Sequence, residues 1–232
     1  MNEFLIKRVI PLTSKSAKVI TPKFAEFFDL EYVGQEQPYM DVLAQQEAAV
    51  QAVFDGGKEH VFMVEHHPVY TAGSSAADDE HLKINDIPVV NAGRGGRFTY
   101  HGPGQRVVYP ILDLRKRGRD LRKYVCDLQK WLIATLAEFG IEAYSADEIG
   151  VWVRTPKGEA KIAAIGVRVR KWVAFHGIAL NVDPNLDHFK GIIPCGIMTK
   201  GVTSMRQLGF EGTMEDVDKV LLEKFTEQFG KN

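Results

Sequence analysis

A glycine- and arginine-rich segment over residues 93–109 is the sequence feature that most limits how this chain can fold. It reads GRGGRFTYHGPGQRVVY, with five glycines between Gly93 and Gly104 and no acidic residue. Glycine permits positive φ and lets the backbone approach another molecule closely, whereas arginine supplies fixed positive charge and forked donors. Packing alone rarely needs that combination. The segment is therefore predicted to hold a ligand rather than to fill a core.

Apolar periodicity predicts regular structure on both sides of this segment. Apolar residues share one face of a predicted helix over residues 39–54, which a pair of glycines ends. Short apolar runs predict three strands, over residues 61–64, 87–90 and 107–112. The glycine-rich segment is expected to join the second and third of these strands.

The second half of the chain begins with the most regular helical pattern and continues with strands. Asp120 is the expected N-cap, apolar residues recur at helical spacing as far as Phe139, and Gly140 ends the helix. Apolar runs then predict four strands, over residues 141–145, 150–154, 160–170 and 173–182. Thr213 is expected to cap a last helix that reaches Phe229.

These elements predict an α/β (α+β) fold in a single domain, with a mixed, largely hairpin-connected sheet flanked by helices. A chain of 232 residues, of which 45% are hydrophobic, is long enough to bury one such core. No linker, repeat or charge block divides it. We expect residues 1–32 to form an N-terminal arm of uncertain role and residues 33–232 to form a single catalytic domain.

Net charge and cysteine content narrow the classes of partner and compartment. The formal net charge is −1 and the pI about 6.7, so no bulk attraction to nucleic acid or to a membrane surface is expected. No run of 18 apolar residues predicts a membrane span. Two cysteines are too few for a disulfide framework and indicate a reducing compartment. We expect a cytoplasmic protein, although the basic N-terminal stretch leaves organelle targeting open.

Lys161 breaks the apolar pattern of the strand predicted over residues 160–170. By strand alternation it shares a face with Ala163 and Ile165, so it is predicted to point toward the apolar side. Burial disfavours the charged form of an amine, which suits a lysine that must accept a proton. The alternative is that a bulge near Gly158 moves Lys161 to the strand edge, where its ammonium stays in water.

Cys195 lies between Pro194 and Gly196, which restrict the backbone around its thiol. Cys126, by comparison, lies on the long predicted helix outside its apolar face and is interpreted as structural. A nucleophilic thiol needs a base or a cation beside it to raise its thiolate fraction. The candidates in this sequence are Lys161, His101, His176 and His188.

Several motifs of the chain together resemble the octanoyltransferase family of lipoate biosynthesis. They are EHHPVYT over residues 65–71, RGGRFTYH over 94–101, KIAAIG over 161–166, FHGIALN over 175–181 and PCG over 194–196. They keep the order and spacing of the family over roughly residues 33–208, and the stretch before them is longer than is typical of it. The resemblance implies a biotin/lipoate protein ligase-like fold.

The resemblance further implies acyl transfer through a covalent intermediate. In the family, the cysteine matching Cys195 forms an acyl thioester, and the lysine matching Lys161 acts as its acid/base partner. The implied donor is octanoyl-acyl carrier protein. The implied acceptors are lipoyl domains, those of 2-oxoacid dehydrogenase E2 subunits and the glycine cleavage H protein. No cofactor is implied, and neither nucleic acid nor a membrane is an implied partner.

The substrate pocket implied by the resemblance is rich in small residues, which would leave room for a medium-length acyl chain in a narrow apolar tunnel. Its positions match Arg94, Gly95, Gly96, Arg97, Phe98, Thr99, Tyr100, His101, Ala164, Ile165, Gly166, Gly177, Ile178 and Ala179. His101 either contacts substrate or orients neighbouring backbone. His66 and His67 would face opposite ways on an extended segment, so no metal site is expected.

Clusters of basic residues in an otherwise neutral chain allow two interpretations. They are either solvated surface charge or a docking site for acidic carrier proteins. The residues concerned are Arg94, Arg97, Arg106, Arg168, Arg170 and Lys171.

Three other functions fit parts of the sequence. An ATP-dependent lipoate or biotin ligase would share the fold and a matching lysine, but would not need the thiol of Cys195. An amidotransferase that moves octanoate between lipoyl domains would use a cysteine. A non-catalytic acyl or carrier-protein binding module would need neither Lys161 nor Cys195.

Overall fold

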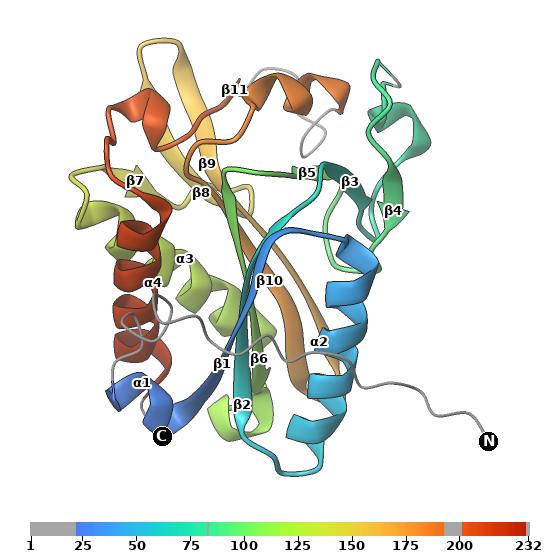
Figure 1. Ribbon diagram of the computed structural model, residues 1–232, viewed down its shortest axis with the longest axis vertical. Coiled ribbons are helices and arrows are strands. Elements are labelled where there is room, and N and C mark those ends of the chain that lie inside the picture. The colour runs from blue at the N-terminus through green and yellow to red at the C-terminus, as the bar shows by residue number, and fades with distance from the viewer. Residues whose placement is uncertain (1–21, 83, 193–200, 231–232) are drawn as a thin grey trace.

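The computed structural model describes residues 22–82, 84–192 and 201–230 (Figure 1). Its described strands form a large mixed sheet in the order β1-β2-β6-β10-β9-β8-β7, with β11 also paired to β9. The pairs β1–β2 and β9–β11 are parallel and the others antiparallel. The strands are β1 (Phe28–Gln37), β2 (Glu59–His66), β6 (Gln105–Asp113), β7 (Ala143–Tyr144), β8 (Val151–Thr155), β9 (Gly158–Arg170), β10 (Val173–Asn181) and β11 (Gly201–Val202).

A second, small sheet lies near one end of the large one (Figure 1). It has the order β4-β3-β5 among the described residues. Its strands are β3 (Val69–Ala72), β4 (Val89–Asn91) and β5 (Thr99–His101). The last of these belongs to the glycine-rich segment, so the middle of that segment is part of a sheet.

Helices cover both faces of the large sheet. The helix α2 (Tyr39–Phe54) lies on one side, and α3 (Leu121–Ala137) and α4 (Met214–Phe229) lie together on the other, with the short α1 (Pro22–Phe27) against α4 (Figure 1). Short 3-10 helices lie between these elements, at η2 (Asp78–Glu80), η3 (Leu114–Arg117), η4 (Leu186–Gly191) and η6 (Arg206–Leu208). The side chain of Asp120 caps α3, and Thr213 forms a capping box with Asp216 at the start of α4.

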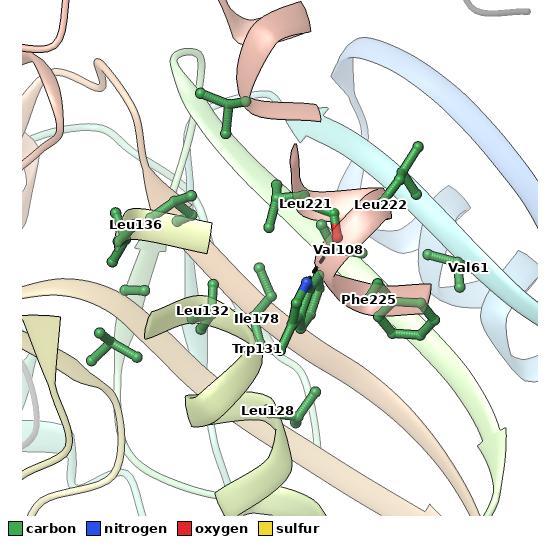
Figure 2. Packing of buried hydrophobic residues seen from close by; sticks show 14 of the residues in the cluster. Val61, Val108, Leu128, Trp131, Leu132, Leu136, Ile178, Leu221, Leu222 and Phe225 are labelled. Carbon is green, nitrogen blue, oxygen red and sulfur yellow. Dashed lines mark hydrogen bonds between the residues drawn. The ribbon is translucent and has the colours of Figure 1, made fainter. Parts of the chain in front are cut away.

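The larger core lies between the sheet and the α3–α4 pair (Figure 2). Leu128, Trp131 and Leu132 project from α3 because apolar residues recur there every three or four positions. The Trp131 Nε1 donates a hydrogen bond to the backbone oxygen of Leu221 at 2.8 Å, so the large indole is buried without an unpaired donor. On the other face, Val42, Val50 and Val53 of α2 pack in a second cluster against the sheet. Burial of this kind contributes about 25 cal/mol per Å² of apolar surface.

The predicted mixed sheet flanked by helices is confirmed, and the predicted helices match α2, α3 and α4. Three details differ. The strand predicted over 141–145 shortens to Ala143–Tyr144, the strand predicted over 87–90 shifts to β4, and β5 interrupts the segment expected only to join strands. Periodicity misplaced these short elements because three residues hold too few apolar positions to define a period.

The N-terminal part of the described chain joins the large sheet. Strand β1 starts at Phe28, which pairs with Glu59 of β2, so the boundary expected at residue 33 falls inside a strand. Residues 1–21 of the expected arm lie outside the described residues. Among those that are described, no helix is long and apolar enough to span a membrane.

Candidate active site

A cavity of about 1000 Å³ lies where the small sheet and its glycine-rich segment meet β9, β10 and α3. Its wall brings together most of the residues singled out in the sequence. They are Arg94, Gly95, Gly96, Arg97, Phe98, Thr99, His101, Lys161, Ala164, Ile165, Gly166, Gly177, Ile178 and Ala179. Tyr100 is not among the lining residues: it is buried, and its hydroxyl lies 2.7 Å from Nδ1 of His188. Cys195 lies outside the described residues.

Strand β9 is irregular beside Lys161. Val151 of β8 pairs with Ala163 of β9, yet the next residue of β8, Trp152, pairs with Lys161. Strand β9 therefore holds one extra residue, Ile162, at this point. Such a bulge re-aims the side chains that flank it.

The bulge decides which face of the sheet carries Lys161. Ala160 and Ala163 both pack in the α3–α4 core although they are three positions apart, so the alternation inverts between them. Lys161 consequently faces away from Ala163, on the side of Ala164, which packs toward α2. The predicted shared face with Ala163 is wrong for this reason. The predicted burial is confirmed, because Lys161 is 7% exposed, and this excludes the solvated lysine expected from a bulge near Gly158.

The head group of Lys161 is held at the start of β8. Its Nζ donates a hydrogen bond to the backbone oxygen of Ile149 at 3.0 Å and lies 4.7 Å from the ring centre of Trp152. Gly150, with φ +139°, leaves the path open, because a Cβ there would lie 2.9 Å from Cε of Lys161 and 2.9 Å from the oxygen of Ala163. Backbone and aromatic groups thus direct the amine.

A chain of hydrogen bonds connects His101 with the backbone of Lys161. The Nδ1 of His101 lies 2.7 Å from Oε1 of Gln105, whose Nε2 donates to Oδ1 of Asn181 at 2.9 Å. The Nδ2 of Asn181 donates to the oxygen of Thr203 at 3.0 Å, and the N–H of Thr203 donates to the oxygen of Lys161 at 3.0 Å. Burial holds the pKa of His101 well below its usual range, so this histidine is neutral and has an orienting partner.

Arg94 holds the glycine-rich segment in shape. Its Nη1 donates to the backbone oxygens of Gly95 and Arg97 at 2.9 Å each, and its Nη2 donates to the oxygen and Oγ1 of Thr71 at 2.7 Å. The side chain is buried at 7% exposure. A forked guanidinium can satisfy several carbonyl groups of a turn at once, so Arg94 is part of the scaffold of this wall.

Neutral imidazoles and phenols lie in the cavity wall and behind it: Tyr39, Tyr109 and His176 line the cavity, whereas His66 does not line it and is hydrogen-bonded to Tyr109. Burial lowers the pKa of His176 to about 3 and that of His66 to about 4. His176 has φ +56°, its N–H donates to Oε1 of Gln46 at 2.9 Å, and its Nδ1 lies 3.4 Å from the hydroxyl of Tyr39. Tyr109 makes a 2.8 Å hydrogen bond to Nε2 of His66. These groups bring polarity to the cavity without charge at neutral pH.

Two of the small residues expected to leave room for a ligand are required by packing. A Cβ at Gly177 would lie 2.3 Å from the oxygen of Val108, and one at Gly166 would lie 2.9 Å from Cδ of Arg94. Neither contact is possible for a real side chain. These glycines therefore allow the close approach of β6 and of the Arg94 side chain, and do not by themselves indicate space for substrate.

The basic residues divide into buried scaffold and exposed surface. Arg106 is fully buried and donates to both carboxylate oxygens of Asp218 at 2.6 and 2.9 Å, and Arg97 pairs with the buried Glu80. Docking of a partner by Arg94 or Arg106 is therefore excluded, because neither reaches the surface. The residues of the cluster that are exposed are Arg97, Arg168, Arg170 and Lys171.

The structure describes Cys126, whereas Cys195 lies outside the described residues. Cys126 is exposed on α3 at the rim of the cavity. The described chain resumes after Cys195 at Gly201, and Val202, seven positions beyond Cys195, lines the cavity and pairs with Lys161. Within the described parts of the chain, no group of three potential metal ligands is found, and His66 is buried whereas His67 is exposed.

Several residues that shape the site were not selected from the sequence. Gln105 lies in the glycine- and arginine-rich segment 93–109 and Asn181 lies in the motif 175–181, so their polar side chains next to apolar strands were a usable signal. Gly150 and Trp152 gave no such signal, because their role depends on the register of β8 against β9.

Known proteins match this chain over most of its length. Residues 38–226 match the family described as the lipoyl protein ligase A/B catalytic domain. The chain is 52% identical over 200 residues to an octanoyltransferase of Parvibaculum lavamentivorans, covering 84% of this chain and 89% of that protein. It is 53% identical over 204 residues to an octanoyltransferase of Dinoroseobacter shibae, covering 83% and 93%.

Solved structures with the same fold are much more distant in sequence. A putative lipoate protein ligase from Thermoplasma acidophilum with bound lipoic acid superposes with a TM-score of 0.71 at 17% identity, over 88% of this chain and 86% of that one. A lipoate-protein ligase A bound with ATP gives a TM-score of 0.69 at 17% identity, over 87% and 85%. At this identity the likeness establishes the fold alone.

Proposed function

The chain belongs to the family of lipoyl protein ligase A/B catalytic domains, and from that premise we propose that it transfers octanoyl groups in lipoate biosynthesis from octanoyl-acyl carrier protein to a lysine of a lipoyl domain. The relatives at about half identity over most of both chains carry the name octanoyltransferase. The chain is accordingly an acyltransferase. The donor, the acceptors and the covalent intermediate are the parts we propose.

In the first half-reaction, the amine of Lys161 takes the proton of the Cys195 thiol. The sulfur then attacks the carbonyl carbon of the donor thioester. As the tetrahedral intermediate collapses, the bond to the carrier sulfur breaks, and Lys161 donates the proton to that sulfur. The product is an octanoyl thioester on Cys195, with one C–S bond formed and one broken.

In the second half-reaction, the ε-amine of the acceptor lysine attacks the acyl carbon on Cys195. An amide C–N bond forms and the C–S bond to Cys195 breaks. The proton lost by the amine passes through Lys161 to the cysteine sulfur, which restores the enzyme. A thioester retains enough reactivity toward an amine for this step, so no nucleotide is required.

The observation that carries this proposal is the placement of Lys161. A lysine that is 7% exposed, directed into a large cavity by a bulge, is costly to bury and needs a reason. Strand β11, which follows Cys195 in the chain, pairs with β9 at this lysine. That adjacency supports an approach of Cys195 to Lys161.

The rest of the wall suits an acyl chain. Apolar and small side chains line the cavity from Ala164 to Val167 and from Gly177 to Ala179. The neutral state of His101 and His176 avoids a charge beside a hydrocarbon tail, which would be costly to desolvate.

Incubation with octanoyl-acyl carrier protein in the absence of ATP tests the proposal. Intact-protein mass spectrometry should show one added octanoyl group, which Cys195→Ala abolishes and Cys126→Ala retains. An absolute need for ATP would instead indicate a ligase, and acylation only from an octanoylated lipoyl domain would indicate an amidotransferase. An adduct that survives Cys195→Ala contradicts the proposed intermediate.

A further inference from the structure

Strand β9 loses its neighbour on one side within the cavity wall: the last residue of β9 that pairs with β8 is Ala163, which lies between the lining residues Lys161 and Ala164. On its other side, β9 continues to pair with β10 as far as Arg170. Residues 164–170 therefore form an open strand edge among the described elements. An uncovered edge presents backbone donors and acceptors that natural proteins normally protect.

The direction of the backbone groups along this edge follows from a single contact. The oxygen of Val167 accepts a hydrogen bond from the N–H of Gly95 at 3.0 Å, so the polar groups of Val167 point to the open side. Ile165 lies two positions earlier and has the same orientation, since these groups alternate along a strand. No described residue makes a hydrogen bond to the backbone of Ile165 on that side.

The open position is inside the cavity. Ile165, Gly166 and Val167 all line it, and Ile165 is half-buried. A backbone N–H and C=O without protein partners in the wall of a cavity can be satisfied by an occupant of that cavity. An N–H and a C=O side by side on a strand edge are complementary to one amide of an extended chain.

We propose that the backbone of Ile165 binds an amide group of the arm that carries the donor thioester, a pantetheine-type arm laid along the edge of β9. This inference rests on the proposed function, because it gives a binding position to the carrier arm of the donor proposed there. The octanoyl chain has no amide and cannot make the pair of hydrogen bonds. Ile165 and Lys161 lie near each other on β9 and both line the cavity, so the amide concerned is the one nearest the reacting sulfur.

An unbranched arm fits this edge better than the peptide backbone of an acceptor. The free stretch is short, because Val151 covers β9 at Ala163 and Gly95 covers it at Val167. Only the groups of Ile165 remain between them. A peptide strand needs several consecutive positions and space for its side chains, whereas a single amide in a slender arm needs one position.

Two donor analogues that differ by one atom test the contact. Octanoyl-N-acetylcysteamine has an amide two carbons from its sulfur, and S-octanoyl-2-mercaptoethyl acetate has an ester there. We expect kcat/KM for acylation of Cys195 to be about tenfold lower for the ester, as for the loss of one hydrogen bond. Equal rates would overturn this inference, whereas failure of both thioesters to acylate Cys195 would instead count against the proposed function.

Substitutions at Ile165 locate the effect. Ile165→Pro removes the N–H and puts the ring in its place; because this N–H lies outside the β10 ladder, proline is tolerable at this edge. The amide-to-ester ratio should fall to about one in this variant and stay near ten in Ile165→Ala, which keeps the backbone donor. A ratio of about ten in a folded Ile165→Pro variant would overturn the assignment.

Amide hydrogen exchange gives a readout that needs no variant to fold. Saturation with S-octylpantetheine, an unreactive thioether, should slow exchange of the Ile165 N–H at least tenfold and leave that of Val169, on the same edge but outside the cavity lining, unchanged. Octanoic acid alone should not protect Ile165. Equal protection by octanoic acid, or protection only by a peptide around the acceptor lysine, would contradict the proposal.

Discussion

The cavity has two walls that the sequence marked equally but that the structure uses differently. The wall over residues 93–101 closes on itself, since Arg94 donates four hydrogen bonds to neighbouring protein acceptors. The wall formed by β9 is interrupted, with a bulge at Ile162 and an open edge after Ala163. The cation of the glycine-rich segment thus holds the backbone in shape, whereas the cation that we propose for the chemistry lies on the irregular strand.

The difference has a simple physical origin. Carbonyl groups in a turn lack regular partners, so a forked donor such as Arg94 is needed to satisfy them. At Lys161 the backbone of β9 is already paired with β8 and with β11, so its side chain is not needed to satisfy carbonyl groups. Lys161 can therefore be directed by Ile149 and Trp152 toward the cavity without a cost to the ladder.

Removing the amine of Lys161 should have the largest effect and separate the two walls most clearly. Lys161→Ala should lower the rate of octanoyl transfer about 10²–10⁴-fold, since it deletes a general acid and base, while the urea midpoint changes little. The measurement is single-turnover acylation by mass spectrometry. Lys157→Ala, at the exposed tip of the same hairpin, is the matched control. Wild-type rates in Lys161→Ala would remove the proposed role of the β9 wall.

The opposite pattern is expected at Arg94. Arg94→Lys keeps the charge but cannot reach carbonyl groups on both sides, so the free energy of unfolding should fall by about 3 kcal/mol. Urea denaturation measures this loss. Arg170→Lys, at an exposed residue, should shift stability by less than about 0.5 kcal/mol. If Arg94→Lys were as stable as the native protein, the scaffold interpretation of this wall would fail.

Gly150 and Gly158 both have positive φ, and comparing them separates the backbone cost of a Cβ at positive φ from a steric clash of that Cβ. Gly150→Ala should lower stability by about 2 kcal/mol and also slow transfer, because the new Cβ meets Cε of Lys161 and the oxygen of Ala163. Gly158→Ala, with φ +111° and no atom within 4 Å of its Cβ, should show only the smaller backbone cost of about 1 kcal/mol. Urea denaturation and transfer kinetics of both variants measure these effects. Equal activity of the two variants would contradict the claim that Gly150 makes room for the Lys161 side chain.

Acid should lower the free energy of unfolding through the buried, neutral His66. The pKa of His66 is lowered to about 4 when folded, against about 6.5 when unfolded, so the unfolded chain binds more protons between these values. Stability contributed by the neutral histidine is complete above pH 6.5 and falls as the pH drops toward 4, by roughly 1.4 kcal/mol per pH unit. His66→Gln should reduce this slope in urea titrations. The exposed neighbour His67→Gln should leave it unaltered, and identical slopes in the two variants would contradict the prediction.

How much of this arrangement could be predicted depends on how local each feature is. The helices α2, α3 and α4 were predictable because each has a long apolar period and clear end signals, such as Asp120 and Gly140. Strands of two or three residues, such as β7 and β5, were not, since they carry no period of their own. The small sheet was missed for the same reason.

The candidate site was predictable as a set of residues but not as an arrangement. Motifs selected about half of the described lining residues, including Lys161 and His101. The orientation of Lys161 was predicted wrongly, because strand alternation extrapolates through a bulge that only the pairing with β8 creates. Arg94 and Arg106 could not be assigned to scaffold before their acceptors, Thr71 and Asp218, were placed beside them.

The sequence by itself determined the long helices, the mixed α/β architecture, the family and the inventory of chemically capable side chains, because these depend on local periodicity and on motifs. Only the tertiary structure decided which face carries Lys161, which cations are buried, and where β9 is left with an open edge at Ile165. The physical reason is that burial, register and hydrogen-bond partners are set by residues far away in the chain, whose contacts no local pattern encodes.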